Sequence, residues 1–118
     1  MLHTPIMVLA VALVAAATPS PAPSSSATTN ATIHMRNFAF IPKTLTIAAG
    51  TSVTVINDDD EAHTVSAIDK SFDSAGLDAH ESWSHVFTKI GTYAYLCELH
   101  PYMKGVIVVR PAASKGSS

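Results

Sequence analysis

The chain has 118 residues and a formal net charge of -2, with 7 Lys and Arg residues against 9 Asp and Glu residues. This length accommodates one domain and excludes barrel enzymes and two-domain nucleotide enzymes, which need more chain. The small net charge gives no support for binding to nucleic acid or to an anionic membrane surface. Apolar residues make up 47% of the chain, which is too apolar for a disordered protein, and the single cysteine excludes an intramolecular disulfide.

The first 17 residues predict an export signal. Residues 6–17 read IMVLAVALVAAA, a stretch without a charge that ends in small alanines. A membrane-spanning helix needs about 20 apolar residues, whereas the apolar region of a signal peptide needs about 7–15. We therefore predict a signal peptide over residues 1–17 and a periplasmic protein. The preceding MLHTP carries no Lys or Arg, so an uncleaved signal that tethers the protein to the membrane is the alternative.

Residues 18–30 read TPSPAPSSSATTN and contain little that could pack into a core. Such a Pro-, Ser- and Thr-rich composition is typical of a semi-rigid linker. We expect the folded domain to comprise residues 31–110 and residues 111–118 to form a loose tail.

Within the domain, short apolar runs alternate with polar residues or are rich in β-branched residues. In chain order they occupy residues 33–35, 38–40, 45–47, 53–56, 63–68, 83–87, 91–97 and 106–109. The phase shift between Met35 and Phe38 predicts a bend or bulge. His85 stands where an apolar residue is expected, which indicates either an interior histidine with satisfied hydrogen bonds or a second bulge, and we favour the bulge. No run has a sustained helical period, so the pattern predicts a β-sandwich.

The segment CELHPYM, residues 97–103, places a thiol, an imidazole and a thioether within one short loop. It follows a predicted strand, so a tight loop can direct Cys97, His100 and Met103 toward one centre. These soft to borderline ligands suit copper, and a blue-copper site needs one further histidine. His63, at the end of the segment NDDDEAH, supplies that histidine at the start of a predicted strand.

Other chemistries of these residues stay open at this point. A lone cysteine or methionine is most often a buried apolar residue. Cys97 and His100 could form a nucleophile and its base, but the sequence shows no recognisable orienting group or set of oxyanion donors. A zinc site formed by Cys97, His63 and His100 is a further alternative, although zinc sites rarely recruit a methionine.

The same segments resemble those of the cupredoxins, the small blue copper proteins. The pattern N-x-D-x-x-x-H at residues 57–63, the run G-T-Y-x-Y-x-C at 91–97 and the closing M-K-G-V-I-V-V at 103–109 all fit this family. Two residues separate His100 from Met103, a spacing most similar to that of the amicyanins. The resemblance covers residues 31–110 and implies an all-β, Greek-key β-sandwich of about eight strands.

The resemblance also implies one copper ion per chain, which cycles between Cu(I) and Cu(II). His63, Cys97 and His100 are then the trigonal ligands and Met103 the weak axial ligand. We expect His63 to be buried and His100 to lie near the surface, surrounded by an apolar rim of Ala62, Leu99, Pro101 and Tyr102.

This resemblance implies single-electron transfer between redox partner proteins, for example a c-type cytochrome or an amine dehydrogenase. We expect a monomer. We also expect that it catalyses no reaction, because Met103 would occupy the axial position. The alternative is a periplasmic copper carrier or buffer without an electron partner. The acidic residues 58–61 are interpreted as a solvated loop, or alternatively as a steering patch for a basic partner.

Two neighbours of the ligands yield specific hypotheses. The hydroxyl of Thr64 is expected to connect the two loops that carry the ligands. Leu99 stands where relatives often have proline, and therefore keeps a backbone N–H. We hypothesise that this amide donates to Cys97 and favours Cu(I), so that Leu99→Pro would lower the reduction potential.

Overall fold

The computed structural model describes residues 29–112 without a gap, together with residues 2, 3, 5, 10 and 12. The predicted signal peptide and linker, apart from a few residues, and residues 113–118 of the tail lie outside the described residues. In the part of the chain that is described, no helix has the length and apolar character that crossing a membrane requires.

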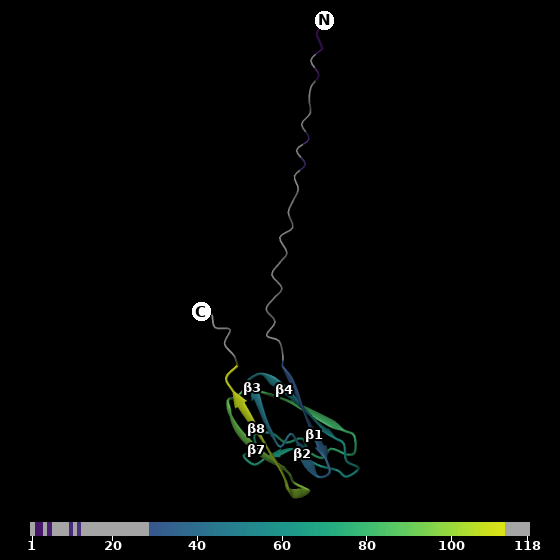
Figure 1. The fold of residues 1–118 in the computed structure, drawn as a ribbon, viewed down its shortest axis with the longest axis vertical. Helices are drawn as coiled ribbons and strands as arrows, with labels where there is room; N and C mark the ends of the chain where they lie inside the picture. The colour runs from purple at the N-terminus through teal and green to yellow at the C-terminus, as the bar shows by residue number, and fades with distance from the viewer. Residues whose placement is uncertain (1, 4, 6–9, 11, 13–28, 113–118) are drawn as a thin grey trace.

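Two four-stranded sheets pack face to face and confirm the predicted all-β Greek-key sandwich (Figure 1). One sheet has the strand order β2-β1-β4-β6 and the other β3-β8-β7-β5. β1 runs parallel to β4 and β3 runs parallel to β8, whereas the remaining neighbours are antiparallel. The strands are β1 (Asn30–Arg36), β2 (Ala39–Ile41), β3 (Thr44–Ala48), β4 (Thr51–Asn57), β5 (Ser66–Ala67), β6 (Ser82–Phe87), β7 (Gly91–Cys97) and β8 (His100–Arg110).

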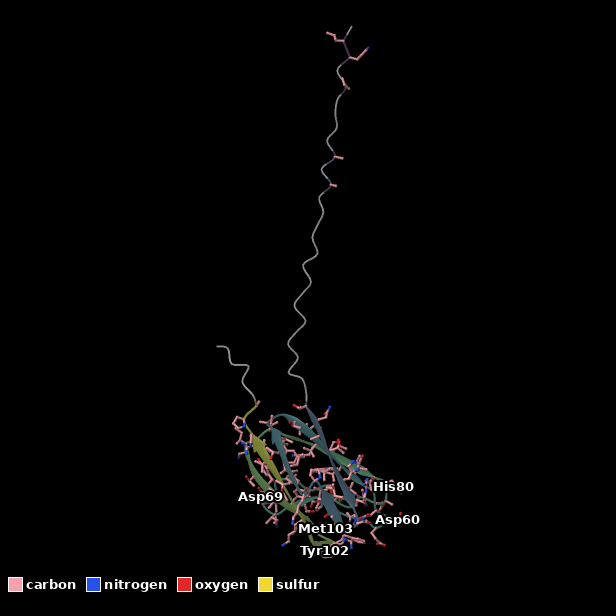
Figure 2. All side chains as sticks on the ribbon, viewed as in Figure 1. Asp60, Asp69, His80, Tyr102 and Met103 are labelled. Atoms are coloured by element: carbon pink, nitrogen blue, oxygen red, sulfur yellow. The ribbon has the colours of Figure 1, made fainter. Side chains whose placement is uncertain are left out.

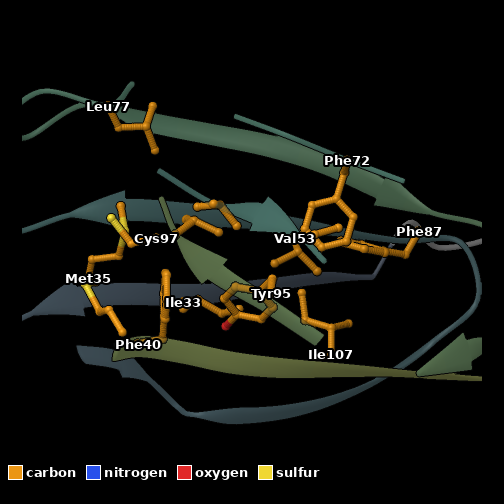
Figure 3. Packing of buried hydrophobic residues seen from close by; sticks show 14 of the residues in the cluster. Ile33, Met35, Phe40, Val53, Phe72, Leu77, Phe87, Tyr95, Cys97 and Ile107 are labelled. Carbon is orange, nitrogen blue, oxygen red and sulfur yellow. The ribbon is translucent and has the colours of Figure 1, made fainter. Parts of the chain in front are cut away.

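The core lies between the sheets and follows from the alternation of apolar residues in the sequence. In β4 every second residue from Thr51 to Asn57 is buried, and in β8 the same holds from Met103 to Val109. Figure 3 shows how these inward side chains meet those of β1 and β7. The fully buried members include Ile33, Met35, Val53, Val55, Val65, Tyr95, Cys97 and Ile107.

Tyr95 and Gly105 form a close pair across β7 and β8. A Cβ atom at Gly105 would lie 2.4 Å from the Cζ and Oη atoms of Tyr95, so only glycine leaves room for this ring. The Tyr95 side chain is fully buried, and its hydroxyl has no hydrogen-bond partner within residues 29–112. Burial accordingly raises the pKa of Tyr95 well above its ordinary value.

The predicted bend after Met35 is confirmed as the tight turn of a β-hairpin. Arg36 pairs with Ala39, so that only Asn37 and Phe38 connect β1 to β2. Both connecting residues have positive φ, 53° at Asn37 and 58° at Phe38. A two-residue turn with two left-handed residues matches the twist of the strands that it joins.

Two expectations about strands were wrong. The pairing of β6 with β4 is continuous from Ser82 to Phe87, so there is no bulge at His85. This half-buried imidazole instead stacks on Trp83, with ring centroids 5.5 Å apart and an interplanar angle of 11°. The strand expected at residues 63–68 is reduced to Ser66–Ala67, because His63 exchanges backbone hydrogen bonds with Leu77 instead.

Candidate metal centre

Three side chains with metal-binding atoms converge at one end of the sandwich. Cys97 ends β7, His100 begins β8, and His63 lies in the loop between β4 and β5. One ligand atom from each residue lies within 4.8 Å of the others. The Sγ atom of Cys97 is 3.8 Å from Nδ1 of His63 and 3.7 Å from Nδ1 of His100. The structure therefore brings together three of the four predicted ligands, although His63 comes from a segment of the chain separate from that of Cys97 and His100.

The spacing of these donors suits a single first-row transition metal. Such an ion binds thiolate sulfur at about 2.3 Å and imidazole nitrogen at about 2.0–2.1 Å. A sulfur and a nitrogen bound to one such ion would be separated by about 3–4 Å. The observed separations of 3.8 and 3.7 Å fit this arrangement. One thiolate, two imidazoles and a nearby thioether are a donor set that suits copper.

Met103 provides the thioether at the same end of the domain. It lies on the inward face of β8 and is almost completely buried. Its neighbour Lys104 pairs with Leu96, so Met103 faces the irregularity between Leu96 and Cys97 in β7. Figure 2 shows Met103 and Tyr102 at the end of the sandwich that is remote from the start of β1 and the end of β8.

A carboxylate fixes the orientation of the His63 ring. Nε2 of His63 is 2.9 Å from Oδ2 of Asp59, and the imidazole is fully buried. An ionised carboxylate only accepts hydrogen bonds, so Nε2 carries the proton and Nδ1 presents its lone pair toward Cys97. Burial raises the pKa of Asp59, but hydrogen bonds from the Phe38 amide, His63 and the Asn37 amide outweigh it and hold this pKa below its ordinary value.

Thr64 connects the two loops that carry the ligands, as predicted. Its backbone N–H donates to the Sγ atom of Cys97 at 3.3 Å, and its Oγ1 accepts the N–H of Glu98 at 2.9 Å. Oγ1 is also 2.9 Å from Oγ of Ser66, which in turn donates to Asp73. Because Ser66 uses its only hydroxyl proton on Asp73, Thr64 must be the donor to Ser66. A continuous chain of hydrogen bonds thus leads away from the Cys97 loop.

The hypothesis about Leu99 was wrong. Among the described residues, the backbone amide that donates to Sγ of Cys97 is that of Thr64, and the amide of Leu99 makes no such bond. The donor comes from a residue 33 positions away in the chain. Leu99→Pro is therefore not expected to change the potential by the route that the sequence suggested.

The buried side chain of Asn57 organises the loop between β4 and His63. Its Nδ2 donates to the carbonyl groups of Glu61 and Leu77 at 2.8 and 3.0 Å, and its Oδ1 accepts the N–H of Asp59 at 2.9 Å. This last contact is a turn in which an asparagine binds the amide two residues later. The sequence analysis gave Asn57 no role of its own, although the N-x-D spacing is the local signal for such a turn.

The acidic residues 58–61 divide into two engaged and two exposed side chains. Asp58 accepts hydrogen bonds from Nδ1 of His34 at 2.7 Å and from Arg36 at 3.0 Å. The hydrogen bond from His34 is the main cause that lowers the pKa of Asp58 below its ordinary value. Asp59 binds His63, so only Asp60 and Glu61 project freely from this loop.

His100 is half-buried and lies among exposed apolar side chains. Leu99 is 56% exposed and Tyr102 is 69% exposed, and Pro101 is also exposed. The sequence analysis missed Phe38, whose ring centroid lies 5.1 Å from that of His100. Three of the four residues predicted for the apolar rim are therefore exposed, whereas Ala62 is half-buried, and the turn between β1 and β2 adds an aromatic residue beside His100.

A β-sandwich that holds a buried cysteine, two converging histidines and an inward methionine at one end has the donor set of a protein that binds one copper ion. The chain belongs to the cupredoxin family, since the family profile described as "Cupredoxin-like domain" matches residues 5–109. Cupredoxins bind copper, and the residues at this site fit that metal.

Among known proteins, the chain is similar to amicyanin-alpha from Methylorubrum extorquens, with 35% identity over 68 residues. This match covers 53% of the present chain and 57% of the relative, so it spans little more than half of that protein. Among solved structures, a purple cupredoxin from Nitrosopumilus maritimus is 32% identical with a TM-score of 0.65, over 68% of this chain and 99% of that one. A copper-containing nitrite reductase from Thermus scotoductus is 34% identical with a TM-score of 0.66, over 70% of this chain but only 23% of the enzyme.

Proposed function

We propose that this protein transfers single electrons between redox partner proteins through one copper ion held by His63, Cys97, His100 and Met103. One observation carries the proposal: Sγ of Cys97 lies 3.8 Å from Nδ1 of His63 and 3.7 Å from Nδ1 of His100, and His100 is half-exposed. When bound there, copper supplies a one-electron couple between Cu(I) and Cu(II). The protein is proposed to act in the periplasm as an exported monomer.

The side chains around the ligands support such a role because they hold the donors in one arrangement. Asp59 fixes the ring of His63, and Thr64 holds both the sulfur of Cys97 and the backbone of the loop that follows. Groups that are already oriented need to move little when the charge of the site changes. Rapid exchange of an electron requires this small rearrangement.

The surface around His100 supports brief contact with a partner protein. Exposed apolar side chains at Leu99, Pro101 and Tyr102 surround this imidazole, whereas His63 is fully buried. Interfaces between electron-transfer proteins are small and transient. We propose that the electron passes through the exposed edge of His100, with a c-type cytochrome or an amine dehydrogenase as the class of partner.

We propose further that the protein catalyses no reaction of its own. Met103 is buried on the inward face of β8, where it would occupy the fourth position of the metal. The similarity to a nitrite reductase extends over only 23% of that enzyme, so it indicates a shared domain. Chemistry on a substrate would need an open coordination position at the metal, and these four donors would leave no such position.

Addition of Cu(II) to the purified protein tests the proposed site. We expect an intense visible absorption band that disappears on reduction, and that Cys97→Ser and His100→Asn abolish or strongly alter. His85→Asn is the matched control, because His85 is also half-buried but lies in β6, away from the ligands. A colourless protein with one equivalent of copper, or equal effects of both histidine variants, would contradict the assignment.

A second measurement separates electron transfer from copper delivery. The reduced, copper-loaded protein is mixed with an oxidised soluble c-type cytochrome, and both absorption and copper content are followed. Electron transfer predicts rapid reduction of the cytochrome with the copper retained. Transfer of copper to a copper-free acceptor protein, without any electron exchange, would favour the carrier function.

A further inference from the structure

Phe38 packs its ring against both histidines of the metal centre. Its centroid lies 5.3 Å from that of His63 at an interplanar angle of 83°, and 5.1 Å from that of His100 at 80°. The two imidazoles lie 5.1 Å apart at an angle of 70°. Each pair has the edge-to-face geometry that aromatic rings prefer. The three rings therefore form one packed cluster, and Phe38 is its only member that is not a proposed ligand.

The two histidines differ in what else orients them. His63 is buried and its Nε2 donates to the carboxylate of Asp59. His100 is half-exposed, and among the described residues its only side-chain hydrogen-bond contact is the one with Sγ of Cys97. Ring packing is consequently what holds the outer part of this imidazole, with Phe38 at 5.1 Å and the more exposed Tyr102 at 6.1 Å.

The backbone at Phe38 indicates that its place is imposed by the surroundings. A φ of 58° is unusual for a bulky residue, and glycine is preferred at this second position of a two-residue hairpin turn. A strained conformation persists only where neighbouring groups over-determine it, and such residues cluster at functional sites.

Asp59 is the group that imposes this conformation. Its Oδ1 accepts the N–H of Asn37 at 2.7 Å, and its Oδ2 accepts the N–H of Phe38 at 3.0 Å. The same Oδ2 accepts Nε2 of His63 at 2.9 Å. One carboxylate thus fixes both the hairpin turn and a ligand, and places the ring of Phe38 over the second ligand.

We propose that Phe38 is a positioning residue of the copper centre, which keeps the imidazole of His100 in place and limits the access of small molecules to the metal. This inference rests on the proposed copper site and adds a residue that contributes no ligand atom. A purely surface role for Phe38, such as docking of a partner, would leave the retention of the metal unchanged.

Release of Cu(I) to an excess of a small chelator such as bicinchoninate tests the proposal. Phe38→Leu keeps the apolar volume but removes the ring, and we expect release to be about tenfold faster because two aromatic contacts are lost. Ile41→Ala is the matched control, since Ile41 is a similarly exposed apolar residue of the same hairpin. Its release rate is expected to change by less than about twofold.

Phe38→Gly separates positioning from stability. Glycine adopts positive φ without strain, so this variant should unfold at the same or a higher denaturant concentration than the wild type. Its copper release should nevertheless be as fast as that of Phe38→Leu. A residue with a merely structural role would change stability and copper retention in the same direction.

The imidazole resonances of the diamagnetic Cu(I) protein provide a readout that does not depend on electron transfer. We expect the His63 and His100 ring protons to shift in Phe38→Leu and to stay unchanged in Ile41→Ala. Wild-type rates of release and unshifted resonances in Phe38→Leu, with the blue band intact in the wild type, would overturn this inference alone. A wild-type protein that binds no copper would overturn the proposed function together with it.

Discussion

The two halves of the sandwich are stabilised in different ways. At the metal end, Asp59, Thr64 and Asn57 each form several hydrogen bonds, and the positions of His63 and Cys97 depend on individual atoms. In the remainder of the described interior, the core consists of apolar side chains from both sheets that pack together. Figure 3 shows this apolar packing, with Cys97 and Phe87 toward opposite ends of the cluster.

This difference predicts which positions tolerate amino-acid substitution. Apolar packing depends on total volume, so substitutions that conserve volume cost less than about 1.5 kcal/mol. A hydrogen bond depends on the presence of one donor and one acceptor. The loss of a single such atom near His63 or Cys97 is therefore expected to alter the position of these proposed ligands. The core should therefore tolerate substitution better than the loops beside it, which reverses the usual pattern for surface loops.

Gly105→Ala tests the apolar part of the core at a position where a single added atom finds no room. The added Cβ would lie 2.4 Å from the ring of the buried Tyr95, so the strand or the ring must move. We expect a loss of about 3 kcal/mol in the free energy of unfolding, at the upper end for overpacking. Chemical denaturation measures this loss.

The double variant Gly105→Ala with Tyr95→Leu is the control for that mechanism. Removal of the ring relieves the clash, so the alanine should cost much less in this background. An equally large cost in both backgrounds would place the cause in the backbone of β8 instead.

Asp59→Asn tests how strongly the proposed metal site depends on a single hydrogen-bonding side chain. An amide in place of the carboxylate gives up a charged acceptor that binds three donors, at His63, Asn37 and Phe38. Replacing a group that orients a metal-binding histidine typically weakens metal affinity about 10–100-fold. Competition with a chelator of known affinity measures the change in copper binding.

Asp60→Asn provides the matched control, since Asp60 is the adjacent residue and is exposed. It has the same change of charge in the same loop, so its copper affinity should stay near that of the wild type. Equal weakening in both variants would indicate that net charge, and not the hydrogen bonds of Asp59, determines the affinity.

Most of the strands and three of the four proposed donors could be predicted because both are encoded locally. Alternating or β-branched apolar runs mark most of the strands, and the segment CELHPYM keeps three donors within one loop. The burial of His63 and the half-exposed position of His100 also agree with the sequence analysis.

The contacts that orient those donors could not be predicted, because they join distant segments. Phe38 is bound by Asp59, 21 residues later in the chain, and the donor to Cys97 lies 33 residues before it. Reasoning from chain neighbours selected Leu99 as that donor, and it was wrong for this reason. Similarly, His85 fills its place by stacking on Trp83, which periodicity does not reveal.

Thr64→Val tests the hydrogen bonds of the metal end with a smaller effect. The variant keeps the shape of the side chain but removes the acceptor for the N–H of Glu98 and the donor to Ser66. We expect a loss of about 1–2 kcal/mol in the free energy of unfolding, since partly buried groups lose their partners. Thr54→Val is the matched control, because its hydroxyl pairs with Ser84 in an exposed position. A cost at Thr54 as large as that at Thr64 would remove the distinction between the two regions.

Tyr95→Phe has the smallest expected effect and tests the apolar half. Among the described residues, the Tyr95 hydroxyl is the only buried side-chain N or O atom without a hydrogen-bond partner. Removal of a hydroxyl that has no partner should raise the free energy of unfolding by about 0.5–1 kcal/mol. Tyr93→Phe is the control and should lower it, because the hydroxyl of Tyr93 donates to the carbonyl of Lys89 at 2.7 Å.

The pH dependence of Tyr95 gives a second check on the same variant. Burial raises the pKa of Tyr95 in the folded protein above the value of about 10 that it has in the unfolded chain. The unfolded chain then releases this proton first as the pH rises, so the wild type loses stability above about pH 10. Tyr95→Phe should lack this part of the alkaline loss, whereas Tyr93→Phe should retain it. An identical alkaline loss in wild type and Tyr95→Phe would show that the hydroxyl reaches water in solution, and the apolar half would then be less closed than the structure indicates.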